Sequence, residues 1–151
     1  GALWTVGRDV RGSLGYGIAA GTSPSIAALA NKSWQIAWNG GGLWTVGPTD
    51  VRGSLGYGIA PGTSPSITGL ANGSWQIAWN AGDLWTVGPT DVRGSLGYGI
   101  AAGTSPQITG LGQSWQIAWN ADGAVWTVGP TDSRGSLGYG IASGTSPSIS
   151  S

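Results

Sequence analysis

The residues that could do chemistry in this chain are few, and most recur at a fixed spacing. The sequence has no His, Cys or Glu, which excludes Ser–His and Cys–His nucleophile pairs, imidazole and thiolate metal sites, and disulfides. The carboxylates are Asp9, Asp50, Asp83, Asp91, Asp122 and Asp132. Four of these occupy one repeated position, so a symmetric fold would hold them too far apart for a glycosidase pair. We expect a protein that is not an enzyme and has no cofactor or metal ion.

An arginine follows each aspartate of the repeated position by two residues. The pairs are Asp9 and Arg11, Asp50 and Arg52, Asp91 and Arg93, and Asp132 and Arg134. In an extended segment the two side chains of a pair share one side, so together they could hydrogen-bond to vicinal hydroxyl groups. A turn-stabilising ion pair, or an Arg stacked on a neighbouring Trp, explains the pairs at least as well.

The ten tryptophans form three repeated series. Trp4, Trp44, Trp85 and Trp126 lie beside glycine-rich hairpins, which fits a binding platform and a core position equally. The other two series alternate with Ile along one segment, which favours the core: Trp34, Trp75 and Trp115, and Trp38, Trp79 and Trp119. Asn80 faces the opposite side of that segment, as a candidate ligand group or as a partner of backbone between units.

These residues are carried by a repeat of about 41 residues, marked by Tyr16, Tyr57, Tyr98 and Tyr139. The chain divides into a partial unit (1–23), three repeats (24–64, 65–105 and 106–146) and the start of a further unit (147–151). Alternation and turn residues predict four antiparallel strands in the middle repeat, at 65–70, 74–80, 84–88 and 95–101. A fixed period of this length is typical of solenoids, propellers and symmetric barrels.

The fold predicted from this pattern is all-β. Each unit has a large face, with Trp75 and Trp79, and a small face, with Gly97 and Gly99, so units can stack sheet on sheet. We expect these glycines to admit a ring of the neighbouring unit. A β-propeller follows from this packing, and a β-trefoil is the alternative. The count of about fifteen strands favours the propeller over the twelve strands of a trefoil.

Four full units would need about one more segment than the chain has. The missing piece is one copy of the Ser-Trp-Gln-Ile-Ala-Trp-Asn strand, and a ring lacking it would leave unpaired edges. We therefore expect a homo-oligomer that completes a larger ring, with a dimer favoured. The alternative is that the chain is a fragment of a longer array.

The charge balance limits the possible partners. Six cations and six anions give a formal net charge of zero without a basic run, so nucleic acid and anionic membranes are not expected partners. No apolar stretch approaches the ~20 residues of a membrane span, so membrane insertion is not expected either. Thirty glycines are compatible with disorder, but ten periodic tryptophans favour a compact protein.

One segment order resembles a known family. Ser-Pro-Ser-Ile, then an aromatic-rich strand, then Gly/Asp-Leu-Trp is similar to the blade repeat of β-propeller lectins, both the tachylectin-2-like proteins and the bacterial fucose-binding lectins of the Photorhabdus type. The resemblance covers the whole chain and rests on repeat length, strand order and Trp placement. It implies a sugar-binding module with shallow pockets between adjacent blades, and glycans as partners.

The residues are compatible with that function, because a pyranose needs an aromatic platform and a few fixed polar groups. The candidate ligand-binding residues are Trp4, Trp44, Trp85, Trp126, Asp50, Arg52, Asp91, Arg93, Asp132, Arg134 and Asn80. The competing hypothesis is a symmetric or engineered repeat scaffold without a ligand. The sequence does not identify a compartment, and an extracellular location is favoured.

Overall fold

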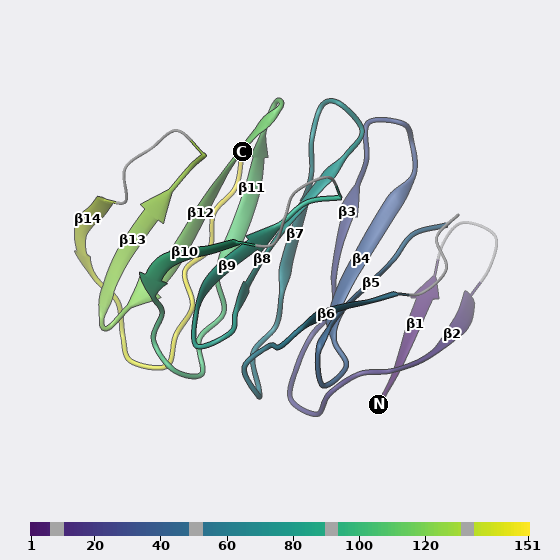
Figure 1. The fold of residues 1–151 in the computed structure, drawn as a ribbon, viewed down its shortest axis with the longest axis horizontal. Coiled ribbons are helices and arrows are strands. Elements are labelled where there is room, and N and C mark those ends of the chain that lie inside the picture. Colours follow the sequence, from purple (N-terminus) through teal and green to yellow (C-terminus); the bar gives the residue numbers. More distant parts are fainter. Residues whose placement is uncertain (7–10, 49–52, 90–93, 131–134) are drawn as a thin grey trace.

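The computed structural model confirms an all-β chain built from repeated antiparallel sheets (Figure 1). It describes residues 1–6, 11–48, 53–89, 94–130 and 135–151. Within these ranges the chain forms fourteen strands and no helix. A helix long and apolar enough to cross a membrane is accordingly not found in the described ranges.

The described strands form one two-stranded sheet followed by three four-stranded sheets, each made of consecutive strands. The two-stranded sheet contains β1 (Ala2–Val6) and β2 (Arg11–Gly17). The first four-stranded sheet contains β3 (Ser25–Ala28), β4 (Trp34–Asn39), β5 (Leu43–Val46) and β6 (Gly53–Tyr57). The second contains β7 (Ser66–Gly69), β8 (Trp75–Asn80), β9 (Asp83–Val87) and β10 (Gly94–Gly99). The third contains β11 (Gln107–Leu111), β12 (Ser114–Ala121), β13 (Ala124–Val128) and β14 (Gly135–Gly140).

The three four-stranded sheets share one register. The second and third strands of each sheet pair so that two tryptophans face each other directly: Trp38 and Trp44, Trp79 and Trp85, and Trp119 and Trp126. The four strands expected in the middle repeat are all present, and each lies within two residues of its expected bounds at either end. Period-2 alternation was enough to locate them because each strand is short and bounded by turn residues.

Consecutive sheets lie side by side in chain order along the long axis of the molecule (Figure 1). Their first strands are neighbours, with β7 between β3 and β11. A ladder of serines joins the segments that precede these strands. The N–H of Ser23 donates to Oγ of Ser64 at 2.9 Å, and that of Ser64 to Oγ of Ser105 at 3.0 Å. The N–H of Ser105 donates in turn to Oγ of Ser146 at 2.9 Å. Every rung spans 41 residues, so the ladder repeats with the sequence.

The second strand of each four-stranded sheet is buried on both faces. In β8 the residues from Gln76 to Asn80 are all buried, although their side chains alternate between the two faces. Trp79 and Ile77 pack against Tyr57 and Ile59 of the preceding unit. Ala78, on the other face, belongs to the core cluster around Trp119 of the following unit. The core is therefore divided among the interfaces between sheets.

The expectation that the glycines of the fourth strand admit a ring of the neighbouring unit is wrong. A Cβ built on Gly97 or Gly99 would meet no atom within 4 Å, so neither glycine makes room for a ring. Gly97 instead has a φ of +70°, within the part of β10 where its register against β9 shifts. A β-bulge that needs a left-handed residue explains this glycine.

Close approach between sheets requires glycine at a different position, near the end of the first strand. A Cβ on Gly69 would overlap the carbonyl oxygen of Ala28, and one on Gly110 would lie 2.5 Å from the carbonyl oxygen of Gly69. Backbone of one sheet thus lies directly against backbone of the next, and only a residue without a side chain fits between them.

Candidate functional site

A stack of three aromatic rings fills each interface between consecutive sheets. In the first, Tyr16 of β2 stacks on Trp38 of β4 with ring centroids 5.5 Å apart and planes 3° apart. Trp44 of β5 lies on the other side of Trp38, at 6.2 Å. The same arrangement recurs with Tyr57, Trp79 and Trp85, and with Tyr98, Trp119 and Trp126. The middle ring is fixed further by its indole N–H, which in Trp38 donates to the carbonyl of Gly17 at 3.0 Å.

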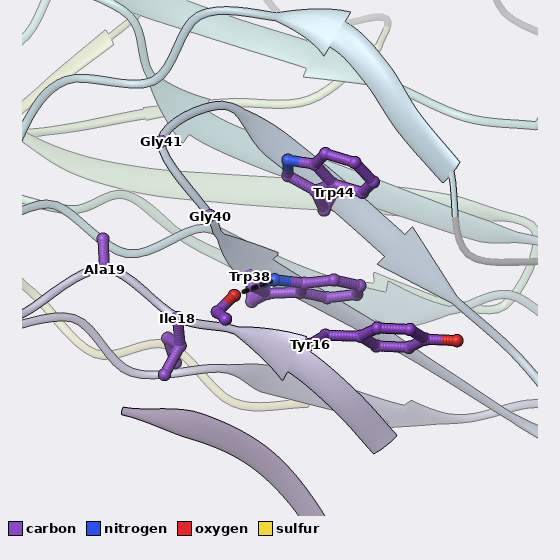
Figure 2. Close-up of a pocket in the computed structure, with 8 residues that line it drawn as sticks. Tyr16, Ile18, Ala19, Trp38, Gly40, Gly41 and Trp44 are labelled. Atoms are coloured by element: carbon purple, nitrogen blue, oxygen red, sulfur yellow. Dashed lines mark hydrogen bonds between the residues drawn. The ribbon is translucent and has the colours of Figure 1, made fainter.

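The first of these stacks borders a cavity of about 420 Å³, which we call the hairpin-end cleft (Figure 2). It lies between the segment after β2 and the hairpin that joins β4 to β5. Its lining consists of Tyr16, Gly17, Ile18, Ala19, Trp38, Gly40, Gly41 and Trp44. None of these residues is charged, and the nitrogen-bearing edges of Trp38 and Trp44 lie on the side of the hairpin (Figure 2). The cleft therefore offers apolar contacts rather than ionic ones.

The predicted platform tryptophans occupy the outer position of the stacks. Trp44, Trp85 and Trp126 are partly buried, and each packs on the fully buried Trp of the neighbouring strand. Trp4 differs from them, with 55% of its surface exposed, since its two-stranded sheet has no described strand corresponding to β4. These rings thus combine a core contact with partial access to solvent, and only Trp44 lines the hairpin-end cleft.

Asn80 is buried, and both its side-chain amide and its backbone carbonyl form hydrogen bonds within the protein. It is 1% exposed, its Nδ2 donates to the carbonyl of Thr104 at 2.9 Å, and its Oδ1 accepts from the N–H of Gly82 at 2.8 Å. Its own carbonyl accepts from the N–H of Ala60 at 2.7 Å. The side chain thereby holds the hairpin of its sheet to the segment that leads to the next sheet. These bonds match the backbone partnership that the sequence offered as the alternative to ligand contact.

The acidic and basic candidates lie outside the described residues, which applies to Asp50, Arg52, Asp91, Arg93, Asp132 and Arg134 and also to Asp9. For Arg11 the structure describes the backbone, as the first residue of β2. Each of these pairs falls in or directly after the segment between the third and fourth strands of a unit. That segment begins after Val46 or Val87 in the first two four-stranded sheets.

A second cleft, of about 360 Å³, lies between the first two four-stranded sheets at the end away from the hairpins. We call it the turn-end cleft, because the β3–β4 and β7–β8 turns form much of its wall. Two indoles, from Trp34 and Trp75, line it together with polar residues: Asn31, Ser33, Gln35, Asn72 and Ser74. Pro48 and Pro89 complete the wall on the side where the third strands end.

Hydrogen bonds inside the turns orient the polar groups of this cleft. Oδ1 of Asn31 accepts from the N–H of Ser33 at 3.0 Å and from its hydroxyl at 2.6 Å. Asn72 and Ser74 repeat both bonds with the same lengths. The side-chain Nδ2 groups of these two asparagines donate to no residue that the structure describes. Each turn therefore presents an amide donor beside an indole.

This cleft was not predicted, because the alternation of Trp34 and Trp75 with Ile favoured the core for both rings. Both rings do pack partly against core clusters. The overlooked signal is the recurrence of Asn, one residue, Ser and Trp at positions 31–34 and 72–75. Such a spacing places an amide and an indole on one short turn.

The third four-stranded sheet departs from this pattern. Its β11–β12 turn is one residue shorter and lacks the Asn that lies two residues before the Ser in the other units. The carbonyl of Gly112 accepts from the N–H of Ala71 at 2.8 Å, which ties this turn to the preceding one. The chemistry at the turn end thus differs between the first and second interfaces of the four-stranded sheets.

In the described ranges, no three carboxylate, imidazole or thiolate side chains come together as a metal site would require. Comparison with known proteins finds no family model that matches the chain and no curated protein that resembles it. The candidate sites therefore rest on the geometry of the two clefts.

Proposed function

We propose that this chain is a multivalent carbohydrate-binding protein whose sites lie between consecutive units. The observation that carries the proposal is the turn-end cleft, where two indoles line one cavity with amide and hydroxyl groups. A pyranose has apolar C–H faces and a rim of hydroxyls, so it matches an aromatic wall that has hydrogen-bond donors at its edge. The resemblance to β-propeller lectins supports the same substrate class.

Charge supports a neutral saccharide in this cleft. Among the described residues, those that line the cleft carry no charged side chain, so a charged ligand would lose hydration without gaining an ionic partner from them. The Nδ2 groups of Asn31 and Asn72 supply donors for hydroxyl oxygens, and the Trp34 and Trp75 rings supply apolar surface. Copies of this cleft on associated chains would gain avidity of about 10²–10⁴ on clustered glycans.

For the architecture we propose that the sheets are blades of a β-propeller. The support is that each four-stranded sheet contacts its neighbours through the same aromatic stack and the same serine ladder. A meander of four antiparallel strands that packs face to face on the next is the building plan of a blade. The β-trefoil stays the alternative architecture.

We further propose that the protein associates with itself, with a dimer favoured, through the free face of β14. Tyr139 and Leu137 on this strand are 71% and 49% exposed, whereas the equivalent Tyr57 and Tyr98 are covered by the next sheet. A second copy would bury this apolar surface. Native mass measurement should give twice the chain mass of 15.1 kDa, and Tyr139→Lys should shift the mass to one chain. A monomeric wild-type protein would contradict self-association.

The glycan proposal is tested by measuring binding of the protein to an array of neutral and aminated sugars. A monosaccharide that binds on the array is then titrated into the protein. We expect Trp34→Leu to weaken binding at the turn-end cleft at least about tenfold, because the apolar wall is lost, as followed by the indole signals of Trp75. Trp115→Leu is the matched control, since Trp115 holds the same strand position in the third sheet but does not line this cleft. Its affinity should stay within about twofold of wild type.

Two outcomes would count against the proposal. If the folded protein bound no sugar on the array, carbohydrate binding would be contradicted. If Trp34→Leu and Trp115→Leu lowered the affinity equally, the turn-end cleft would not be the binding site. The first outcome would favour a scaffold without a ligand. One observation supports that alternative. Among the described residues, no buried side-chain nitrogen or oxygen lacks a hydrogen-bond partner, so these polar groups need no ligand to complete their hydrogen bonds.

A further inference from the structure

Among the residues that the structure describes, β1 is paired along one edge only. Its partner is β2, and these two strands form the sheet at one end of the row of sheets (Figure 1). The equivalent strands β5, β9 and β13 are each paired along both edges. The edge of a strand presents backbone N–H and C=O groups that can pair with another segment, so β1 can accept a further strand.

A groove of about 220 Å³ lies beside β1, and we call it the β1-edge groove. Thr5 of β1 lines it together with Ile26 and Ile36 of the next sheet, and none of its lining residues is charged. Ile26 is 62% exposed there, whereas the equivalent Ile67 and Ile108 are only 6% exposed. The groove is smaller than the about 300–1,000 Å³ of small-molecule sites, so it suits side chains of a protein segment better than a separate ligand.

The other units show which segment covers such an edge. In the second four-stranded sheet β8 pairs with β9, and Ala78 lies opposite Thr86. β8 also contacts β11, the first strand of the next sheet. The sequence Leu-Trp-Thr-Val of β9 is repeated in β1. A strand with the sequence of β8 would therefore pair with β1 in the same register and cover Ile26 of β3.

A small side chain is needed where this added strand faces the groove. Ala78 of β8 lies on the face toward the following sheet, where it belongs to one core cluster with Ile108 and Ile117. Ile26 and Ile36 are the equivalents of these two isoleucines at the β1-edge groove. An alanine fits against them, and a larger side chain would hold the added strand away from β1.

A glutamine of the added strand would find a hydrogen-bond partner on β1. In the second sheet Nε2 of Gln76 donates to Oγ1 of Thr86 at 2.8 Å, and this hydroxyl donates to the carbonyl of Ile77 at 2.9 Å. The same two bonds recur at Thr45 and Thr127. The hydroxyl of Thr5, at the equivalent position of β1, has no such partner among the described residues.

We propose that the β1-edge groove is a strand-addition site, which binds an extended peptide segment in trans as an antiparallel partner of β1. The segment has the chemistry of the second strand of a unit, with Gln and Ala facing Thr5 and Ile26, and with large apolar side chains on its other face. Its last Trp would lie opposite Trp4, which is 55% exposed. The site is separate from the turn-end cleft, so it does not depend on carbohydrate binding.

The test uses a fluorescein-labelled peptide with the sequence of residues 74–80, carrying terminal lysines for solubility, titrated into the intact protein. Fluorescence anisotropy should show saturable binding of one peptide per chain. Hydrogen exchange at the amides of β1 should slow when the peptide is bound, while exchange in β13, which is already paired on both edges, should not change. A peptide with the sequence of residues 95–101 is the control of equal length, and it should not bind.

Two substitutions locate the peptide. Ile26→Lys should weaken its binding at least about tenfold, because a charge replaces apolar surface in the groove. Leu111→Lys is the matched control, since Leu111 is also an exposed apolar residue of a first strand but does not line the groove. Ala78→Leu in the peptide should weaken binding by a similar factor of about ten, and this change leaves the protein itself unaltered.

Several results would overturn the proposal. Absence of saturable binding, or unchanged exchange in β1, would contradict strand addition. Equal weakening by Ile26→Lys and Leu111→Lys would place the peptide elsewhere, as would full affinity of the Ala78→Leu peptide. If Ile26→Lys halved the native mass of the protein, a second copy of the chain would be the occupant of the groove instead. A glycan array without any bound sugar would leave each of these results unaffected.

Discussion

Replacing Trp79 with alanine is expected to lower the free energy of unfolding by about 3–5 kcal/mol. The side chain is 0% exposed and lies in the centre of the second aromatic stack, between Tyr57 and Trp85. Its indole N–H donates to the carbonyl of Gly58 at 2.9 Å, so the change leaves a cavity and also deprives a backbone acceptor of its partner. Both losses fall on the interface between two sheets.

Urea unfolding followed by circular dichroism gives this number, and Trp4→Ala is the control. Trp4 belongs to the third strand of its unit and is 55% exposed, so its truncation should cost less than about 1 kcal/mol. If the two variants were equally destabilised, or if Trp79→Ala lost less than the control, the packing between sheets would not be the main source of stability.

Gly69→Ala is expected to destabilise the protein by about 3 kcal/mol through a single added methyl group. The new Cβ would overlap the carbonyl oxygen of Ala28 and would also lie 3.3 Å from a methyl carbon of Leu29. The overlapped atom is backbone in the neighbouring sheet, so it cannot rotate away as a side chain would. The two sheets must separate locally, and the contacts between β3 and β7 weaken.

Gly58→Ala is the matched control for this change. A Cβ there would meet no atom within 4 Å, and the φ of Gly58 is outside the left-handed region, so the cost should stay within about 0.5 kcal/mol. Thermal unfolding of the two variants beside the wild type separates the effects. A loss of similar size in both would mean that glycine is needed for a general backbone reason and not for the approach of two sheets.

The sequence was sufficient to predict the all-β class and the strands. Alternation of Trp75, Ile77 and Trp79 is strong because a strand has a period of two, and the flanking glycines and prolines end each run. Because the sequence repeats, the strands located in one unit predict the strands at the equivalent positions of the other units. Trp-rich aromatic clusters follow for the same reason, because the Tyr and Trp positions recur with the strands.

The sequence could not show which glycines are required, or why. Gly97 and Gly69 both lie in strands, yet the first supplies a positive φ at a bulge and the second a close approach of backbone. This distinction depends on the distance between sheets, which no local pattern encodes. The turn-end cleft was missed for a related reason, since it forms only when the Trp34 and Trp75 turns of two units come together.

The serine ladder has a consequence for how such a chain can change its length. In the third unit the turn before β12 is one residue shorter, while the hairpin before β13 is one residue longer. The ladder spacing nevertheless stays at 41 residues on both sides of Ser105. Loops at opposite ends of the sheets therefore differ by single residues between units while every serine of the ladder keeps its partner.

Duplication or deletion of a whole unit also preserves the serine ladder. A chain that gains or loses one repeat between two ladder serines regains a hydroxyl acceptor for every N–H in the row, because each rung joins only adjacent units. Unequal crossover between repeats would thus yield longer or shorter chains that keep every rung of the ladder, whatever ligand any one unit binds.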